Sequence, residues 1–117
     1  MNENNSGTIN YVNMPEAKHI LMGDIKLRPF AGDELMLVRV EAPENSIAPD
    51  HEHPHEQMSV LLTGRAIFRM DGKETLLVPG DAVRIPSNTT HGATFVEASV
   101  MFDIFTPIRE DFLAALS

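Results

Sequence analysis

Short apolar runs, each closed by turn residues, follow one another along most of this chain. Residues 66–70 and 73–78 are separated only by Asp71-Gly72, two residues that tolerate positive φ. Apolar runs on both sides of Asp-Gly predict a β-hairpin. Strands this short and this closely spaced are typical of an antiparallel sandwich or barrel, so we expect an all-β fold.

Further runs of the same kind cover residues 35–40, 58–62, 82–85, 91–97 and 99–105. One helix is expected near the end of the sequence. Thr106 is a favourable N-cap, Pro107 suits the first helical position, and the run Asp-Phe-Leu-Ala-Ala-Leu follows. Arg109 would then lie in the first turn, where the helix dipole disfavours a cation.

The 117 residues, 43% of them hydrophobic, are enough for one domain with a packed core. Residues 1–8 are small and polar and are expected to form an N-terminal arm, with a single domain over residues 9–117. The N-terminus lacks the features of a secretory signal, and no apolar run approaches the roughly 20 residues that span a bilayer. We therefore expect a cytoplasmic protein.

Acidic residues outnumber basic ones by 17 to 9, which gives a formal net charge of −8. Nucleic acids and anionic membranes attract basic surfaces, so neither is expected as a partner. A small anionic substrate remains compatible, because it responds to local charge. The chain contains no Cys, which excludes disulfides, thiolate zinc sites, iron–sulfur clusters and cysteine nucleophiles.

Three of the five histidines crowd into the segment from His51 to His55, and Glu56 and Gln57 follow at once. On an extended segment His51 and His53 project to the same side, so both can reach one ion. Neutral imidazole suits Zn, Ni, Fe or Cu, and Mn less well. Taken alone, the same residues could form a solvated polar loop.

The flanking residues resemble the first motif of the cupin family. That motif has His-x-His, a short gap, a Glu or Gln, and a Gly further on, and His51, His53, Gln57 and Gly64 fill it in register. His55 falls in the variable gap, where it is expected to support the ligands or lie at the rim of the site. Asn45 stands where this motif usually has Gly, a mild departure because Asn tolerates left-handed backbone.

The second cupin motif has Gly, Pro and a final His, and Gly80, Pro86 and His91 match it. Asn88 replaces another usual Gly, and Phe95 stands where the motif often ends in Asn. Alone, His91 would be a surface-turn histidine. The resemblance implies a double-stranded β-helix, the cupin jelly-roll barrel, with a short C-terminal helix.

The resemblance also implies a divalent metal ion held by His51, His53, Gln57 and His91, with Zn, Ni, Mn and Fe all compatible. Gln57 brings no charge, so the ion would stay a strong Lewis acid. The set also departs from the two-His-one-carboxylate pattern of many non-haem iron oxygenases. Without the motif, Gln57 could equally be a buried amide, and His19, outside both motifs, is expected to be structural.

Asp103 lies in the last apolar run, where alternation groups it with Met101 and Phe105 and places Phe102 and Ile104 on the opposite face. Both faces are apolar, so the strand is expected to be covered on both sides. Desolvation would raise the pKa of Asp103, which suits a proton-transfer group. A structural salt bridge or a hydrogen-bonded core carboxylate fits these residues as well.

A narrower resemblance covers Asp103, Phe105, Thr106-Pro107, Arg109 and the residues up to Leu113, which look like the ending of KdgF-type cupins, the pectin-degradation proteins. In that branch the Asp, Phe and Arg belong to the active pocket, which carries over to Asp103, Phe105 and Arg109. The branch is similar to enzymes that open cyclic 4,5-unsaturated uronates to the linear keto form.

The resemblance therefore implies a metal-dependent ring-opening or tautomerising enzyme that acts on an unsaturated uronate or a similar sugar acid. A cupin dioxygenase is the alternative enzyme, and a non-catalytic module that binds a sugar acid is an alternative of another class. We also expect a homodimer, because small cupins often pair through a remaining sheet edge.

Overall fold

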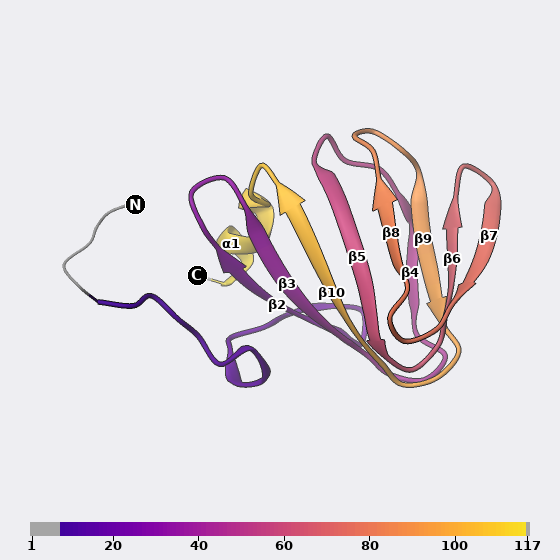
Figure 1. Cartoon of the computed structure of the whole chain (residues 1–117), viewed down its shortest axis with the longest axis horizontal. Helices are drawn as coiled ribbons and strands as arrows, with labels where there is room; N and C mark the ends of the chain where they lie inside the picture. The colour runs from indigo at the N-terminus through magenta and orange to yellow at the C-terminus, as the bar shows by residue number, and fades with distance from the viewer. Residues whose placement is uncertain (1–7, 117) are drawn as a thin grey trace.

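The computed structural model describes residues 8–116, and these contain ten strands, one 3-10 turn and one α-helix (Figure 1). The elements are η1 (Met14–Glu16), β1 (Ile20–Met22), β2 (Ile25–Ala31), β3 (Met36–Ala42), β4 (Ile47–His51), β5 (Glu56–Thr63), β6 (Ala66–Met70), β7 (Lys73–Leu77), β8 (Ala82–Ile85), β9 (His91–Phe95), β10 (Ser99–Thr106) and α1 (Glu110–Leu116). Apart from Thr8, the expected arm over residues 1–8 lies outside the described residues. No helix in the described part of the chain is long and apolar enough to cross a membrane.

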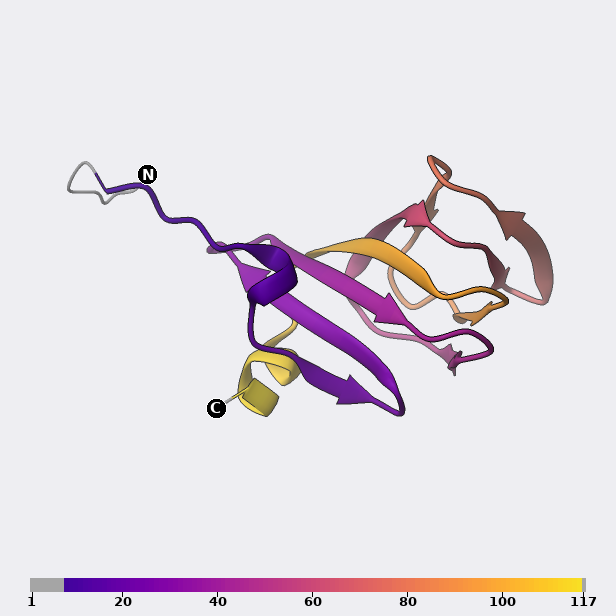
Figure 2. The same cartoon turned by 90° about the horizontal axis from the view of Figure 1, so that it is seen from below.

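Two antiparallel sheets make up the barrel. The larger has the order β1-β2-β3-β10-β5-β8, and the smaller has the order β4-β9-β6-β7. Helix α1 lies beside β1, β2 and β3 at one end of the molecule, whereas β6 and β7 lie at the opposite end (Figures 1 and 2). This arrangement confirms the expected double-stranded β-helix with a short C-terminal helix.

Strand β3 shows why the sheet folds around a single core. Met36, Val38, Val40 and Ala42 are buried, and the residues between them are only partly covered, so the strand follows a strict two-residue alternation. Burial of apolar surface of this kind is the main stabilising contribution to the fold. The neighbouring strands β2 and β10 bring their own buried residues onto the same inner face.

The turn residues behave as the sequence predicts. Asp71 and Gly72 have φ of 50° and 78°, which joins β6 to β7 as a tight hairpin. Asn45 and Asn88, which replace glycines of the cupin motifs, have φ of 66° and 58°. Gly64 has φ of 90°, and a Cβ there would lie 2.5 Å from the carbonyl oxygen of Ala98. The turn after β5 therefore requires glycine.

The predicted start of the helix was wrong. Thr106 is the last residue of β10, and α1 begins only at Glu110. The amides of Phe112 and Leu113 donate to the carbonyl of Arg109 at 3.1 and 3.3 Å, so Arg109 lies just before the first turn. Acidic residues occupy that turn instead, which agrees with the helix dipole.

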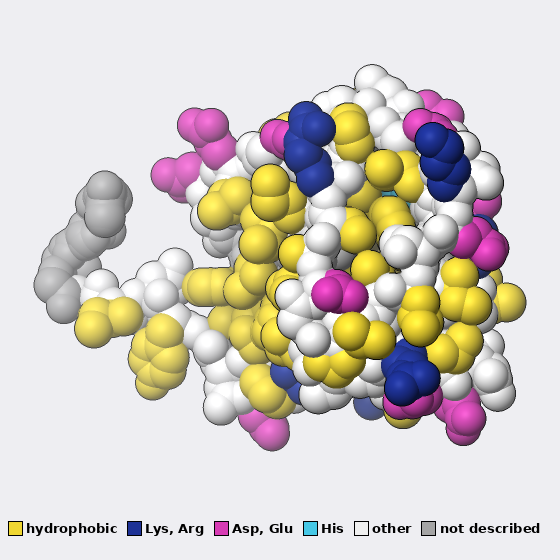
Figure 3. Space-filling view, turned by 45° about the vertical axis from the view of Figure 1, so that its right-hand side comes forward, with side chains coloured by type: hydrophobic (Ala, Val, Ile, Leu, Met, Phe, Trp, Pro, Cys, Tyr) yellow, Lys and Arg dark blue, Asp and Glu magenta, His cyan; other side chains and the backbone are white. Residues whose placement is uncertain are grey.

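The expectation that both faces of β10 are covered was also wrong on one side. Phe105 is 2% exposed on the inner face, whereas Ile104 on the outer face is 37% exposed. Met58, opposite Ile104 in the register of β5 and β10, is 51% exposed. Figure 3 shows hydrophobic side chains over much of one face of the molecule, interrupted by a few charged groups.

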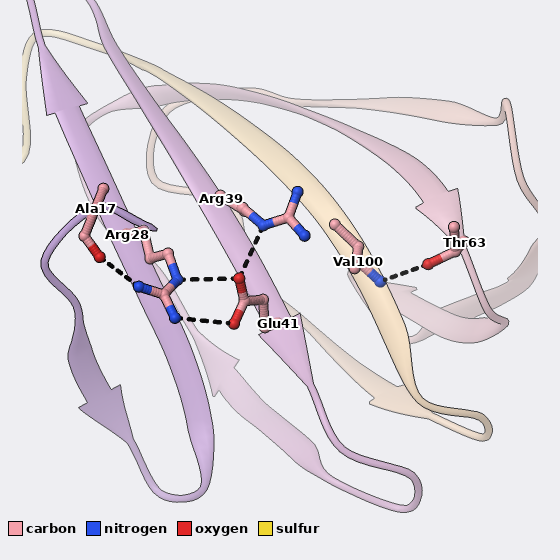
Figure 4. A network of polar contacts seen from close by, with 6 residues as sticks. All are labelled: Ala17, Arg28, Arg39, Glu41, Thr63 and Val100. Atoms are coloured by element: carbon pink, nitrogen blue, oxygen red, sulfur yellow. Dashed lines mark hydrogen bonds and ion pairs between the residues drawn. The ribbon is translucent and has the colours of Figure 1, made fainter. Parts of the chain in front are cut away.

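On β2 and β3 the outer face also carries a network of charged side chains. Nε of Arg28 on β2 and Nε of Arg39 on β3 lie 2.9 and 2.8 Å from the same carboxylate oxygen of Glu41 (Figure 4). Arg28 also donates to the backbone carbonyl of Ala17, just after η1. This network holds the segment before β1 against the sheet.

Candidate metal centre

Three histidines from two distant parts of the sequence meet at one end of the barrel. His51 ends β4, His91 begins β9, and His53 lies in the connection from β4 to β5. The ring centroid of His91 lies 4.4 Å from that of His51 and 4.9 Å from that of His53. One ring nitrogen from each residue lies within 4.8 Å of the others. His53 and His91 are buried, and His51 is exposed to solvent.

The approach of β4 to β9 brings His51 and His91 together. The two residues are partners in the strand register, and an irregularity in β4 lies between Ala48 and His51. A Cβ on Gly92 would lie 2.8 Å from the carbonyl oxygen of Ala48 and would also collide with the side chain of Asp50. Glycine directly after the ligand candidate therefore permits the close approach that pairs the two histidines, a role that sequence reasoning missed.

Backbone carbonyls fix the tautomer of all three rings. Each Nδ1 lies within hydrogen-bond distance of a carbonyl oxygen two residues away in sequence: His51 to Pro49 at 2.8 Å, His53 to His55 at 3.1 Å, and His91 to Thr89 at 2.8 Å. A carbonyl can only accept, so Nδ1 carries the hydrogen in each ring. In the neutral rings every Nε2 then carries a free lone pair, and a neutral imidazole with such a nitrogen can bind a metal.

Gln57 adds a fourth donor atom beside these lone pairs. Its Oε1 lies 3.0 Å from Nε2 of His53, and both atoms are acceptors in the tautomer described above. Nε2 of His91 is buried and has no hydrogen-bond partner. Unpaired buried acceptors are costly, and a cation among them removes that cost. The four side chains therefore fit a divalent ion.

Burial also keeps two of the imidazoles neutral. Desolvation, reinforced by the positive charge of Arg109, lowers the pKa of His53 to about 4. Desolvation lowers the pKa of His91 as well. Both rings are thus deprotonated and available as ligands at neutral pH.

Asp103 lies on β10 directly opposite Ser59 of β5. The Ser59 hydroxyl donates to Oδ1 of Asp103 at 2.7 Å, and the Gln57 amide donates to Ser59 Oγ at 2.9 Å. Desolvation raises the pKa of Asp103 to about 6, although the hydrogen bonds and Arg109 act in the opposite direction. A carboxyl group with such a pKa can both give and take a proton near neutral pH.

Arg109 reaches the same region from the segment before α1. Its guanidinium carbon lies 5.1 Å from the ring centroid of Phe105 and 4.1 Å from that of Phe112. Its Nη2 pairs with Asp111 at 2.9 Å, and the arginine side chain is only 12% exposed. The Phe105 ring also packs 5.7 Å from the ring of His53. Asp103, Phe105 and Arg109, predicted from the C-terminal segment, thus lie beside the three histidines.

A cavity of about 320 Å³ lies among these groups, and all of them except His53 and Asp111 line it. Its polar lining consists of His51, Gln57, Ser59, His91, Asp103 and Arg109. The rest is apolar and includes Met22, Ile25 and Leu27, from strands β1 and β2 that the sequence reasoning did not predict. Ser59 was missed too, although its position two residues after Gln57 on a strand could have indicated a shared face.

The two remaining histidines contribute no ring to the cluster. The backbone carbonyl of His55 accepts from His53, which agrees with a supporting role. Its ring lies 5.4 Å from that of His53, centroid to centroid. His19 is exposed just before β1.

Comparisons with known proteins show the family to which this fold belongs. Residues 38–105 match the family model of the cupin domain. The pectin degradation protein KdgF of Dickeya dadantii is 35% identical over 83 residues, which cover 69% of this chain and 76% of that protein. The structure of KdgF from Halomonas sp. has a TM-score of 0.79 and 29% identity, and the match covers 86% of this chain and 96% of the other. The structure of an RmlC-like cupin from Shewanella frigidimarina has a TM-score of 0.83 and 26% identity, and the match covers 90% of this chain and 96% of the other. The chain belongs to the cupin family, and within it resembles KdgF.

Proposed function

We propose that this cupin is a metal-dependent isomerase that opens the ring of an unsaturated uronate, or of a related sugar acid, and converts the resulting enol into a ketone. The observation that carries the proposal is the position of Asp103, a carboxyl with raised pKa that lines the same cavity as His51 and His91. The likeness to the pectin degradation protein KdgF supports an acidic sugar as substrate.

The side chains of His51, His53, Gln57 and His91 would hold a divalent ion. Because all four are neutral, a bound ion supplies a strong Lewis acid for carboxylate and hydroxyl oxygens. Zn, Ni, Mn and Fe remain candidates, since imidazole and amide ligands suit several divalent ions.

The proposed reaction is an isomerisation with no net gain or loss of atoms. The bond between C1 and the ring oxygen breaks, and the proton of the C1 hydroxyl passes to that oxygen, which leaves an aldehyde at C1 and an enol hydroxyl on C5. A proton is then added at C4, and the enol proton leaves to give the ketone. Asp103 transfers the proton in this conversion of the enol into the ketone. A positioned acid–base group of this sort contributes about 10²–10⁴-fold in rate.

Arg109 and Phe105 complete the proposed pocket. The Arg109 guanidinium would pair with an anionic oxygen of the substrate, because it carries the positive charge in the polar part of the cavity lining. Phe105, which is 2% exposed, forms part of the wall and limits where the sugar ring can lie.

Three assays separate this proposal from its alternatives. Loss of the absorbance of a 4,5-unsaturated uronate in the presence of metal-loaded protein supports ring opening. Uptake of oxygen by the iron-loaded protein with an enolic substrate would support a dioxygenase instead. A bound sugar acid without turnover of any uronate would support a non-catalytic binding module and overturn the proposal.

A homodimer and a cytoplasmic location also remain predictions. The exposed apolar side chains of Met58 and Ile104, which are partners on the outer face of the larger sheet, support a second copy at that face. Light scattering tests the dimer, and Ile104→Glu should then shift the protein toward the monomer.

A further inference from the structure

Ser59 stands between the metal candidate ligands and the proposed proton-transfer group. It lies on β5 two residues after Gln57 and is 3% exposed. Its Oγ accepts from Nε2 of Gln57 at 2.9 Å and donates to Oδ1 of Asp103 at 2.7 Å. It falls between Gln57 and Gly64 of the first cupin motif, at a position for which the motif specifies no residue.

The direction of these hydrogen bonds follows from the chemistry of the groups. A carboxylate can only accept, and a hydroxyl has one hydrogen to donate. When Ser59 gives that hydrogen to Asp103, it can only accept from Gln57. The NH₂ group of Gln57 must then turn toward Ser59, which leaves Oε1 on the side of His53.

Without Ser59 the amide has a competing orientation. In the structure Oε1 of Gln57 lies 3.0 Å from Nε2 of His53. If the amide were turned by 180°, its NH₂ group would take the place of Oε1 and donate to the lone pair on Nε2. That arrangement forms an ordinary hydrogen bond and occupies two potential ligands at once. A cation would have to break this bond before it could bind.

We propose that Ser59 is a positioning residue that holds the Gln57 amide with its oxygen toward the three histidines, and thereby sets the affinity of the site for a divalent cation. The inference rests on the metal site of the proposed function but on none of its reaction steps. Residues that orient metal ligands commonly change affinity by about 10–100-fold when they are removed.

The test measures Zn²⁺ affinity by competition with a chromophoric chelator, on protein first stripped of metal. Ser59→Ala should weaken Zn²⁺ binding by about 10-fold or more. Ser99→Ala is the matched control, because Ser99 is also a buried strand serine, 4% exposed, but its hydroxyl lies within hydrogen-bond distance of the backbone carbonyls of Glu97 and Arg65 and of no proposed ligand. It should leave the Zn²⁺ affinity unchanged.

A second pair of variants separates orientation of the amide from general loosening of the strand. In a Gln57→Ala background there is no amide to orient, so adding Ser59→Ala should leave the residual Zn²⁺ affinity within about 3-fold, a strongly non-additive result. An equal loss in both backgrounds would overturn the proposal, as would unchanged affinity of Ser59→Ala alone. If the wild type binds Zn²⁺ but turns over no uronate, the proposed function fails while this inference still stands or falls on the affinities.

Discussion

Nε2 of His53 and Oε1 of Gln57 lie 3.0 Å apart with no hydrogen to share between them. The His53 hydrogen is on Nδ1, where it binds the carbonyl of His55, and the Gln57 hydrogens are directed to Ser59. Two acceptors at this distance repel each other in a buried site unless a cation compensates. The pair is therefore a local indicator of metal binding, independent of any family motif.

Metal binding should stabilise the fold, and the histidines should be responsible. At a Zn²⁺ concentration of about 100 times Kd, the free energy of unfolding should rise by about 2.7 kcal/mol. His51→Ala, His53→Ala and His91→Ala should each sharply reduce bound metal and leave a folded barrel. Metal content and circular dichroism measure both effects. His19→Ala is the control, because His19 is outside the cluster, and full metal occupancy in all three cluster variants would refute the ligand assignment.

The pH dependence of metal affinity should be shallower than that of three ordinary histidines. Below about pH 6, proton competition at three imidazoles of ordinary pKa would approach a slope of about three log units of affinity per pH unit. The pKa of His53 is lowered to about 4, so this ring does not compete for protons until the pH falls much further. We expect a slope of at most about two between pH 6 and pH 5, measured by chelator competition. A slope near three would contradict the effect of burial on His53.

Asp103→Asn should stabilise the metal-free protein at high pH. Burial raises the pKa of Asp103 from 3.8 to about 6, so the folded state binds the proton more tightly than the unfolded state. The free energy of unfolding then falls as pH rises from about 4 to about 6, because the carboxylate must ionise in a desolvated place. Asn removes this cost, so the variant should gain about 1–3 kcal/mol at about pH 8 and almost nothing at about pH 4.

Urea unfolding at the two pH values measures that difference. The alternative role of Asp103, as a structural hydrogen-bonded carboxylate, predicts the opposite sign. In that case Asp103→Asn would destabilise the protein at high pH, where the carboxylate is ionised.

Arg109 variants should separate substrate binding from support of the helix. Arg109→Ala should raise KM by about 10–100-fold, because a charge-assisted contact contributes about 1.5–3 kcal/mol. Arg109→Lys keeps the charge but loses the stacking on Phe112, so its KM should lie between that of the wild type and that of Arg109→Ala. Steady-state kinetics and melting temperature should be measured on the same preparations. If Arg109 only braces α1, the melting temperature falls and KM stays unchanged.

Asp111→Asn is the control for the Arg109 variants. It removes the ion pair with Arg109 but leaves the guanidinium in place. Since the Asp111 side chain is 61% exposed, the pair contributes little stability, and KM should be unaffected.

The sequence predicted every strand from β3 onward except β4, whereas β1 and β2 were not predicted. Strand β2 was missed because Pro29 interrupts its apolar alternation, and Pro usually marks the end of a strand. Pro29 stays in register with Val38 of β3, but the pairing with β1 ends at Leu27, so the other side of β2 has no partner strand at Pro29 and the structure tolerates the proline there. Helix α1 was predicted, but Thr106 continues the ladder of β10 opposite Glu56 and cannot serve as its cap.

The candidate site was accessible to sequence reasoning only where a motif marks it. His51, His53 and His91 were found because their spacing matches the cupin motifs. Ser59 was not, because a serine on a strand carries no distinctive pattern, and its role depends on the register that sets it opposite Asp103. Gly92 likewise matters through the approach of another strand, which local sequence does not reveal.

In the proposed reaction Asp103 transfers a proton beside a metal held by the histidines and Gln57. The most direct test compares wild type and Asp103→Asn at equal, measured metal content, by following the loss of 4,5-unsaturated uronate. We predict that the variant binds the metal as wild type does and turns the uronate over at least about 10²-fold more slowly. Equal turnover by the two proteins at matched metal content would contradict the proposed role of Asp103.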